Sequence, residues 1–108
     1  MKLITYCTGG GKDLILEYLD RLPKDEAAEG YAILKVIKFH GYDALDSLNT
    51  RQIKGKLWEI KFRRHNRIFY AVVENGCIYL LHACKKQKGK AELFEVETAD
   101  RRMKEILG

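Results

Sequence analysis

Three short apolar segments in the second half of the chain constrain its fold more than any other feature. Residues 57–63 alternate between apolar and charged side chains, which is the two-residue period of a strand. Residues 67–73 are the second apolar segment and follow a tight connection. Asn75-Gly76 is a typical hairpin turn before the third segment, 77–84. The sequence therefore predicts a three-stranded antiparallel meander, whose first strand has one apolar face and one cationic face.

Helical patterns flank the predicted meander on both sides. Residues 2–7 resemble a short strand, while residues 12–22 and 25–40 carry apolar side chains at helical spacing. Residues 42–56 are polar and without a clear period, which predicts a loop, and the helical period returns from residue 91. The pattern predicts an α+β fold, in which a strand and a helical hairpin pack on a small antiparallel-rich sheet with a C-terminal helix.

A chain of 108 residues has the usual size of one hydrophobic core, so we expect a single domain spanning 1–108. Several large aromatic side chains fall on the apolar positions of the predicted strands and helices. We expect these side chains in the core: Tyr6, Tyr18, Tyr31, Phe39 and Trp58.

The charge of the chain is unevenly distributed. Twenty Lys and Arg against fifteen Asp and Glu give a formal net charge of +5, and the excess concentrates between residues 51 and 90. A basic segment of this kind favours a polyanionic partner, because each phosphate that it neutralises releases a counterion. A solvated surface without a partner is the plain alternative.

The cysteines and the hydropathy pattern indicate the compartment. Cys7, Cys77 and Cys84 are an odd number without a C-x-x-C pair, which favours a reducing environment over a disulfide framework. The apolar run at the N-terminus is too short for a signal peptide, and no run reaches membrane-spanning length. We therefore expect a cytoplasmic protein that does not associate with a membrane.

A metal site is not expected from the spacing of the candidate ligands. Cys77 and Cys84 are an odd number of residues apart on one predicted strand, so they should point to opposite faces. His82 and Cys84 can share a face, but two ligands do not complete a site. The sequence predicts no metal and no other cofactor.

The basic residues around the meander should meet at one edge of the sheet. In an antiparallel meander, the end of the first strand lies near the start of the second, and the end of the third strand returns beside that start. The cations at these positions are Lys61 and Arg63 on the first strand, Arg67 on the second, and Lys85, Lys86 and Lys88 after the third.

Convergent Lys and Arg side chains are suited to phosphodiester cleavage without a metal, because negative charge builds on the phosphate oxygens in the transition state. In RNA the 2′-hydroxyl is an internal nucleophile, so the protein mainly orients it and removes its proton. The base could be a lysine with a lowered pKa, His65 or His82, and the sequence does not choose between them. A basic rim that only binds nucleic acid or an acidic protein is the alternative.

Three segments resemble, in the same order along the chain, the strands of HigB-like toxins of the RelE/ParE superfamily. They are Lys56 to Arg63, Arg67 to Tyr70 and Leu80 to Lys88. A C-terminal helix rich in Glu and Arg extends the resemblance over almost the whole chain. The resemblance implies a RelE-like fold and the toxin of a type II toxin-antitoxin system. It further implies a ribosome-dependent mRNA endoribonuclease that cleaves by 2′-hydroxyl attack without a metal.

The resemblance also implies partners and site residues. The partners would be mRNA, the ribosome and a cognate antitoxin with a helix-turn-helix domain, HigA-like, with DNA reached only through the antitoxin. Catalytic roles would belong to Lys61, Arg67 and Lys86. RNA would be bound by Arg63, Arg64, His82, Lys85 and Lys88.

This sequence departs from the family pattern at several of these positions. Glu59 stands where the best-studied RelE-like enzymes have a lysine, and Ala83-Cys84 replaces the Gly-Phe of the HigB-like branch. No tyrosine follows Lys88 to stack on a base. Two further functions therefore stay open, a ParE-like inhibitor of DNA gyrase and a nucleic-acid-binding module without catalysis.

Overall fold

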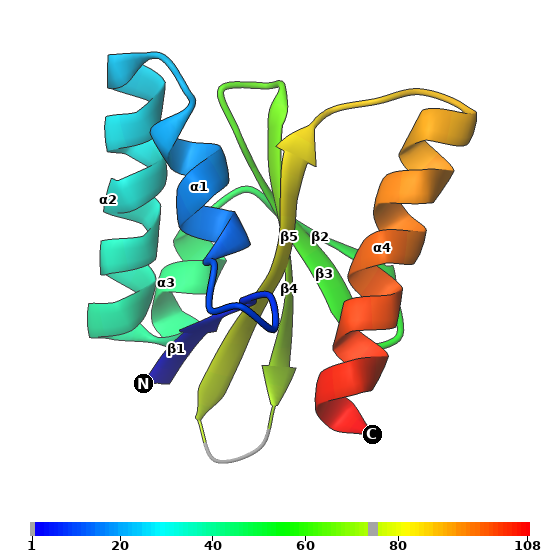
Figure 1. Cartoon of the computed structure of the whole chain (residues 1–108). Coiled ribbons are helices and arrows are strands. Elements are labelled where there is room, and N and C mark those ends of the chain that lie inside the picture. The colour runs from blue at the N-terminus through cyan, green and yellow to red at the C-terminus, as the bar shows by residue number, and fades with distance from the viewer. Residues whose placement is uncertain (1, 74–75) are drawn as a thin grey trace.

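The computed structural model describes residues 2–73 and 76–108. Within them the fold is α+β, with a five-stranded sheet of strand order β1-β5-β4-β3-β2. Helices α1, α2 and α3 cover one face of the sheet and α4 covers the other (Figure 1). The strands are β1 (Lys2–Thr5), β2 (Thr50–Lys54), β3 (Leu57–Phe62), β4 (Asn66–Val73) and β5 (Cys77–Lys85). The helices are α1 (Leu14–Asp20), α2 (Lys24–His40), α3 (Tyr42–Ser47) and α4 (Lys90–Leu107).

The predicted meander is confirmed by the pairing of β3, β4 and β5, which are antiparallel neighbours. The β4–β5 pairing extends to Val73 opposite Cys77, while Asn75 of the predicted turn lies outside the described residues. Strand β1 joins the same sheet by pairing in parallel with β5. The helical hairpin and the C-terminal helix are also confirmed, with boundaries close to those that the apolar periodicity predicts.

Two apolar clusters hold the layers together, one on each face of the sheet. The first cluster joins buried residues of α1 and α2, such as Leu19 and Ile37, to Ile60 and Ile68 of the sheet. The second joins Ala99 and Met103 of α4 to Leu57, Phe69, Ala71, Leu81 and Cys84. Both faces of the central strands are therefore buried, which accounts for the almost continuous burial of β4.

The prediction of a loop over residues 42–56 was wrong, because this segment contains α3 and β2. Ala44 is buried in the first cluster, so α3 is a single short turn of helix held by packing. Strand β2 is polar and exists through its pairing with β3, where Arg51 lies opposite Glu59. Elements that depend on tertiary contacts leave little periodicity in the sequence.

The expectation that all five aromatic residues lie in the core was wrong for three of them, because Tyr6 is half-buried against Arg102 of α4 and belongs to neither cluster. Tyr18 and Trp58 pack against the first cluster, but Phe39 is 72% exposed and Tyr31 is 38% exposed on α2. Both lie on the outer side of a helix whose opposite side faces the sheet. Helical spacing does not by itself separate the flank of an apolar stripe from its centre.

A register shift in β5 alters which side chains share a face. Tyr70 pairs with Leu80 and Phe69 with His82, so Leu81 is an extra residue between the two pairs. Such a bulge breaks the strict alternation of side chains along the strand. The register therefore brings Cys77 to the same face as Cys84, contrary to the expectation that they point apart.

Helix packing contains one close backbone approach. A Cβ added to Gly30 of α2 would lie 2.6 Å from Leu19 Cδ2 of α1, and Leu19 is fully buried. Glycine at this position lets the two helices of the hairpin approach each other closely. No helix within residues 2–73 and 76–108 has the length and apolar character needed to cross a membrane.

Candidate functional site

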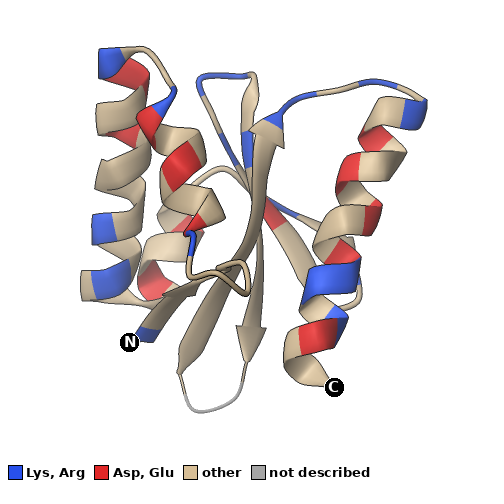
Figure 2. Ribbon diagram, viewed as in Figure 1, with Lys and Arg blue, Asp and Glu red and all other residues tan. Residues whose placement is uncertain are grey.

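The predicted convergence of cations is confirmed for the β3–β4 turn and the segment after β5, but Arg67 is buried beneath α4 and Lys61 lies beside it. Asn66 at the start of β4 pairs with Lys85 at the end of β5. Just beyond this pair, the backbone N–H of Lys86 donates to the carbonyl of His65 over 2.7 Å. The β3–β4 turn and the segment after β5 therefore lie side by side, and Figure 2 shows Lys and Arg on both. We call residues 63–65 and 85–90 the basic edge.

Three of the predicted site residues on the basic edge face solvent. Arg64, Lys86 and Lys88 are exposed, and in the part of the chain that the structure describes none of them takes part in an ion pair. Arg64 adopts a left-handed backbone conformation, with φ of 62°, in the tight turn between β3 and β4. These cations are available to bind phosphate groups.

Arg63 and Lys85 belong to the same edge but turn toward helix α2. Arg63 Nη1 lies 3.2 Å from Asp25 Oδ2, and its Nε lies 3.1 Å from Glu29 Oε1. Lys85 Nζ lies 3.8 Å from Glu26 Oε1. The expectation that Arg63 shares the polar face of β3 with Lys61 was wrong, because the strand ends at Phe62 and the chain turns there.

His65 forms a histidine–carboxylate pair on the basic edge. Its Nε2 lies 2.7 Å from Glu26 Oε1, which also accepts a hydrogen bond of 2.9 Å from Asn66 Nδ2. These hydrogen bonds from Asn66 and His65 hold the pKa of Glu26 below its usual range, so this group is a carboxylate. Because a carboxylate only accepts, Nε2 carries the hydrogen and Nδ1 of the neutral ring is left as an acceptor.

The predicted cationic face of β3 is not an open surface, because α4 covers it together with the neighbouring face of β4. Glu59 and Arg67 are almost fully buried there and form an ion pair through Arg67 Nε. Arg67 Nη1 also lies 3.3 Å from Glu92 Oε1 of α4. Arg51 Nη2 and Lys61 Nζ lie 2.9 and 3.9 Å from Glu59 Oε1. Arg67 is therefore enclosed by carboxylates, while Lys61 is partly exposed at the border of the cluster.

Two atoms of this buried cluster lack hydrogen-bond partners among the described residues, Glu59 Oε1 and Arg67 Nη2. Glu59 Oε1 is close to Arg51 without the angle of a hydrogen bond, so that contact is an ion pair only. Charges in the interior need partners on several sides, because desolvation of each ion costs several kcal/mol. The cluster is thus held by coulombic contacts as much as by hydrogen bonds.

His82 lies in a second polar cluster beneath α4 and not at the basic edge. Its Nε2 is 2.8 Å from Glu95 Oε2, and its Nδ1 is 3.1 Å from Arg102 Nη1. Arg102 only donates, so Nδ1 accepts and Nε2 donates to Glu95. Burial lowers the pKa of His82, which favours the neutral ring. Both nitrogens are engaged, so His82 is not placed to bind RNA at the surface.

Glu95 supplies the third potential metal ligand that sequence spacing did not reveal. One ligand atom each of His82, Cys84 and Glu95 lies within 4.8 Å of the others. A metal on His82 Nε2 would require a hydrogen on Nδ1, where the Arg102 guanidinium already donates. Burial and the neighbouring Glu95 raise the pKa of the Cys84 thiol. The contacts therefore fit a hydrogen-bonded cluster better than a metal centre.

Sequence reasoning missed the part that α4 plays in both clusters. Glu92, Glu95 and Arg102 lie on the face of α4 that meets the sheet, together with Ala99 and Met103 of the second apolar cluster. Their spacing of three and seven residues is that of one helix face. Charged residues at helical spacing within an apolar stripe could therefore have indicated from the sequence that α4 brings polar side chains to the sheet.

One family of known proteins matches most of the chain. It is described as Phage derived protein Gp49-like (DUF891), and the match covers residues 17–104. The matched range contains the meander, the basic edge and nearly all of α4. No curated protein matches the sequence.

Proposed function

The chain belongs to the Gp49-like family of phage-derived proteins, a toxin-like family of the RelE/HigB type, and on this premise we propose that it cleaves messenger RNA on the ribosome. A toxin-like family implies an antitoxin partner. We further propose a HigB-like toxin whose HigA-like antitoxin carries a helix-turn-helix domain, and a reaction that needs no metal.

The observation that carries this proposal is the position of the His65–Glu26 pair on the same edge as exposed cations. His65 Nδ1 is the ring nitrogen that Glu26 does not engage, and Arg64 and Lys86, exposed on the same basic edge, take part in no ion pair within residues 2–73 and 76–108. A base beside several cations is the combination that metal-free RNA cleavage requires. A surface that only binds nucleic acid needs the cations but not the base.

In the proposed reaction, His65 Nδ1 takes the proton of a 2′-hydroxyl. The 2′-oxygen attacks the adjacent phosphorus, the bond from phosphorus to the 5′-oxygen breaks, and that oxygen takes a proton from water as it leaves. Arg64 and Lys86 stabilise the charge on the phosphate oxygens, and Glu26 stabilises the histidine while it is protonated. The products are a 2′,3′-cyclic phosphate and a 5′-hydroxyl end.

The other predicted site residues have different roles in this proposal. Lys88 on the basic edge and Lys61 beside it would bind neighbouring phosphates of the RNA strand. Arg67 would be a positioning residue, because it neutralises Glu59 inside the protein and does not reach solvent. His82, enclosed by Glu95 and Arg102, would maintain the contact between β5 and α4.

Primer extension on a reporter mRNA in a translation extract tests the proposal. The wild-type protein should produce cuts in translated message only, and His65→Gln and Lys86→Ala should reduce cutting by about 100-fold. Lys38→Ala is the matched control, since Lys38 is an exposed cation near the C-terminal end of α2 and His65 faces its N-terminal end. Intact message with the wild type and all three variants would contradict cleavage. Inhibition of DNA supercoiling by gyrase in a parallel assay would then favour the gyrase inhibitor.

A further inference from the structure

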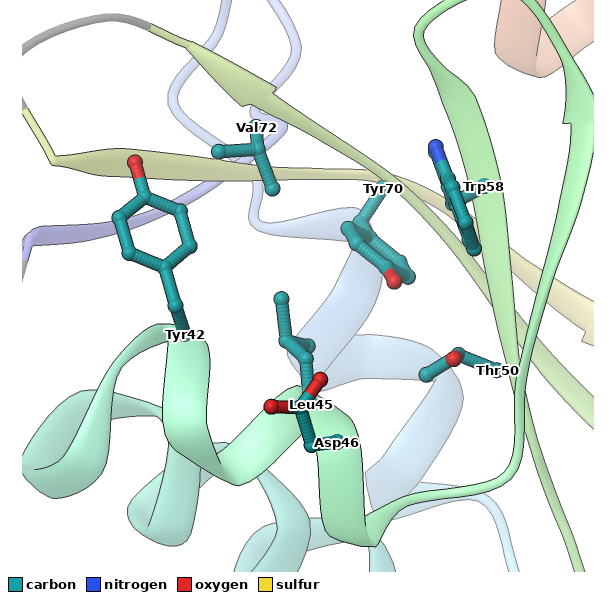
Figure 3. Close-up of a pocket in the computed structure, with 7 residues that line it drawn as sticks. All are labelled: Tyr42, Leu45, Asp46, Thr50, Trp58, Tyr70 and Val72. Carbon is teal, nitrogen blue, oxygen red and sulfur yellow. The ribbon is translucent and has the colours of Figure 1, made fainter.

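A pocket of about 290 Å³ opens between helix α3 and the sheet, on the face opposite to α4. Figure 3 shows its lining side chains, which come from α3, β2, β3 and β4. The lining residues are Tyr42, Leu45, Asp46, Thr50, Trp58, Tyr70 and Val72. This pocket belongs neither to the basic edge nor to the polar clusters beneath α4.

Three aromatic rings define the character of the pocket. Trp58 and Tyr70 are paired residues on β3 and β4, so their side chains stand next to each other on the same face. Tyr42 reaches from α3 toward β4, and in Figure 3 it lies on the other side of Tyr70 from Trp58. Aromatic faces carry partial negative charge and attract cations.

Asp46 adds a full negative charge to these rings. Its carboxylate lines the pocket from α3, and it takes part in no ion pair among residues 2–73 and 76–108. An anion would be repelled from this pocket, and an apolar ligand would leave the carboxylate of Asp46, which is exposed, without a counter-ion. A bare divalent metal would find too few oxygen ligands.

We propose that the α3 pocket binds the head of an organic cation, a quaternary ammonium or guanidinium group, with Asp46 as the counter-ion and Tyr42, Trp58 and Tyr70 as the surrounding rings. The pocket is at the lower end of the size range of small-molecule sites, which suits a head group better than a large ligand. A free cation and the arginine side chain of a peptide share this chemistry of recognition. Binding here does not depend on the nuclease proposal.

Trp58 provides the probe, because it is the only tryptophan in the chain. Its fluorescence and its indole N–H resonance are followed while choline is added to the whole protein, with the neutral isostere 3,3-dimethyl-1-butanol as the control ligand. Arginine amide is compared with neutral citrulline amide. A short peptide with an internal arginine is also added, and its affinity relative to that of the free cations distinguishes a peptide side chain from a free cation as the ligand. A saturable change with at least one cation, with a Kd of about 1 mM or tighter and no such change with its isostere, supports the proposal.

Asp46→Asn should weaken binding at least about threefold, because the counter-ion is lost while the shape is kept. Asp43→Asn is the matched control, since Asp43 is an exposed carboxylate on the same helix that does not line the pocket. Unfolding midpoints of both variants should equal that of the wild type. The proposal is overturned if neither probe shows saturable binding, if the isosteres bind as well as the cations, or if Asp46→Asn binds as tightly as Asp43→Asn.

Discussion

The buried ion pair between Glu59 and Arg67 should dominate the response of this fold to mutation. Replacing Arg67 by Met leaves the buried Glu59 with two weaker partners, Arg51 at 2.9 Å and Lys61 at 3.9 Å. Removing one member of a buried pair typically costs about 3–5 kcal/mol of unfolding free energy, and these remaining contacts place the expected loss at about 3 kcal/mol. The same loss is expected for Glu59→Leu, which leaves Arg67 with Glu92 alone.

The double variant Glu59→Leu with Arg67→Met separates this effect from ordinary loss of packing. With no charge left to desolvate, its unfolding free energy should lie within about 1 kcal/mol of the wild type. Urea unfolding of the four proteins, at constant m, should give a coupling energy for the pair of roughly 5–7 kcal/mol. Additive losses, or a loss below about 1 kcal/mol in Arg67→Met, would refute the view that the pair is buried and coupled. Loss of toxicity in an Arg67 variant would then report on chemistry and not on folding.

Three further results are expected. Gly30→Ala should lower the unfolding free energy by about 1–3 kcal/mol, because the added methyl group meets buried Leu19; an unchanged thermal midpoint would contradict the packing of α1 on α2. The lowered pKa of His82 means that the unfolded chain binds a proton more readily, so stability should fall as the pH drops below 6.5, the ordinary pKa of histidine. The fall should be smaller in His82→Gln, and an equal decrease of the urea midpoint in both proteins between pH 7 and about 5.5 would contradict this. Lys86→Ala and Lys88→Ala should each reduce the salt dependence of binding to single-stranded RNA, by about 0.7 in the slope of log K against log salt; unchanged slopes would place the RNA elsewhere.

The elements that local patterns specify could be predicted from the sequence. Alternation in 57–63 and the apolar spacing in 25–40 gave β3 and α2, because each pattern follows from the geometry of a single segment. The antiparallel order of the meander then placed Lys86 beside the β3–β4 turn without knowledge of any other contact.

The features that depend on two segments at once could not be predicted in this way. Glu59 and Arg67 lie on the face of the sheet that carries the second apolar cluster, and the position of α4 over that face makes them buried. His82 turns toward α4 together with Leu81 because of a bulge that leaves no mark in the composition of β5. The pairing of His65 with Glu26 joins residues 39 positions apart, so a surface histidine gained significance only from the structure.

The chemistry at the ends of a cut message tests the account most directly. RNA cleaved by the wild-type protein in a translation extract is recovered, and its ends are identified by labelling with and without prior phosphatase or kinase treatment. Attack by the 2′-hydroxyl with His65 as base predicts a 2′,3′-cyclic phosphate upstream and a 5′-hydroxyl downstream, with the yield retained by Lys38→Ala and lost in His65→Gln. A 5′-phosphate end, or full cleavage by His65→Gln, would contradict the account.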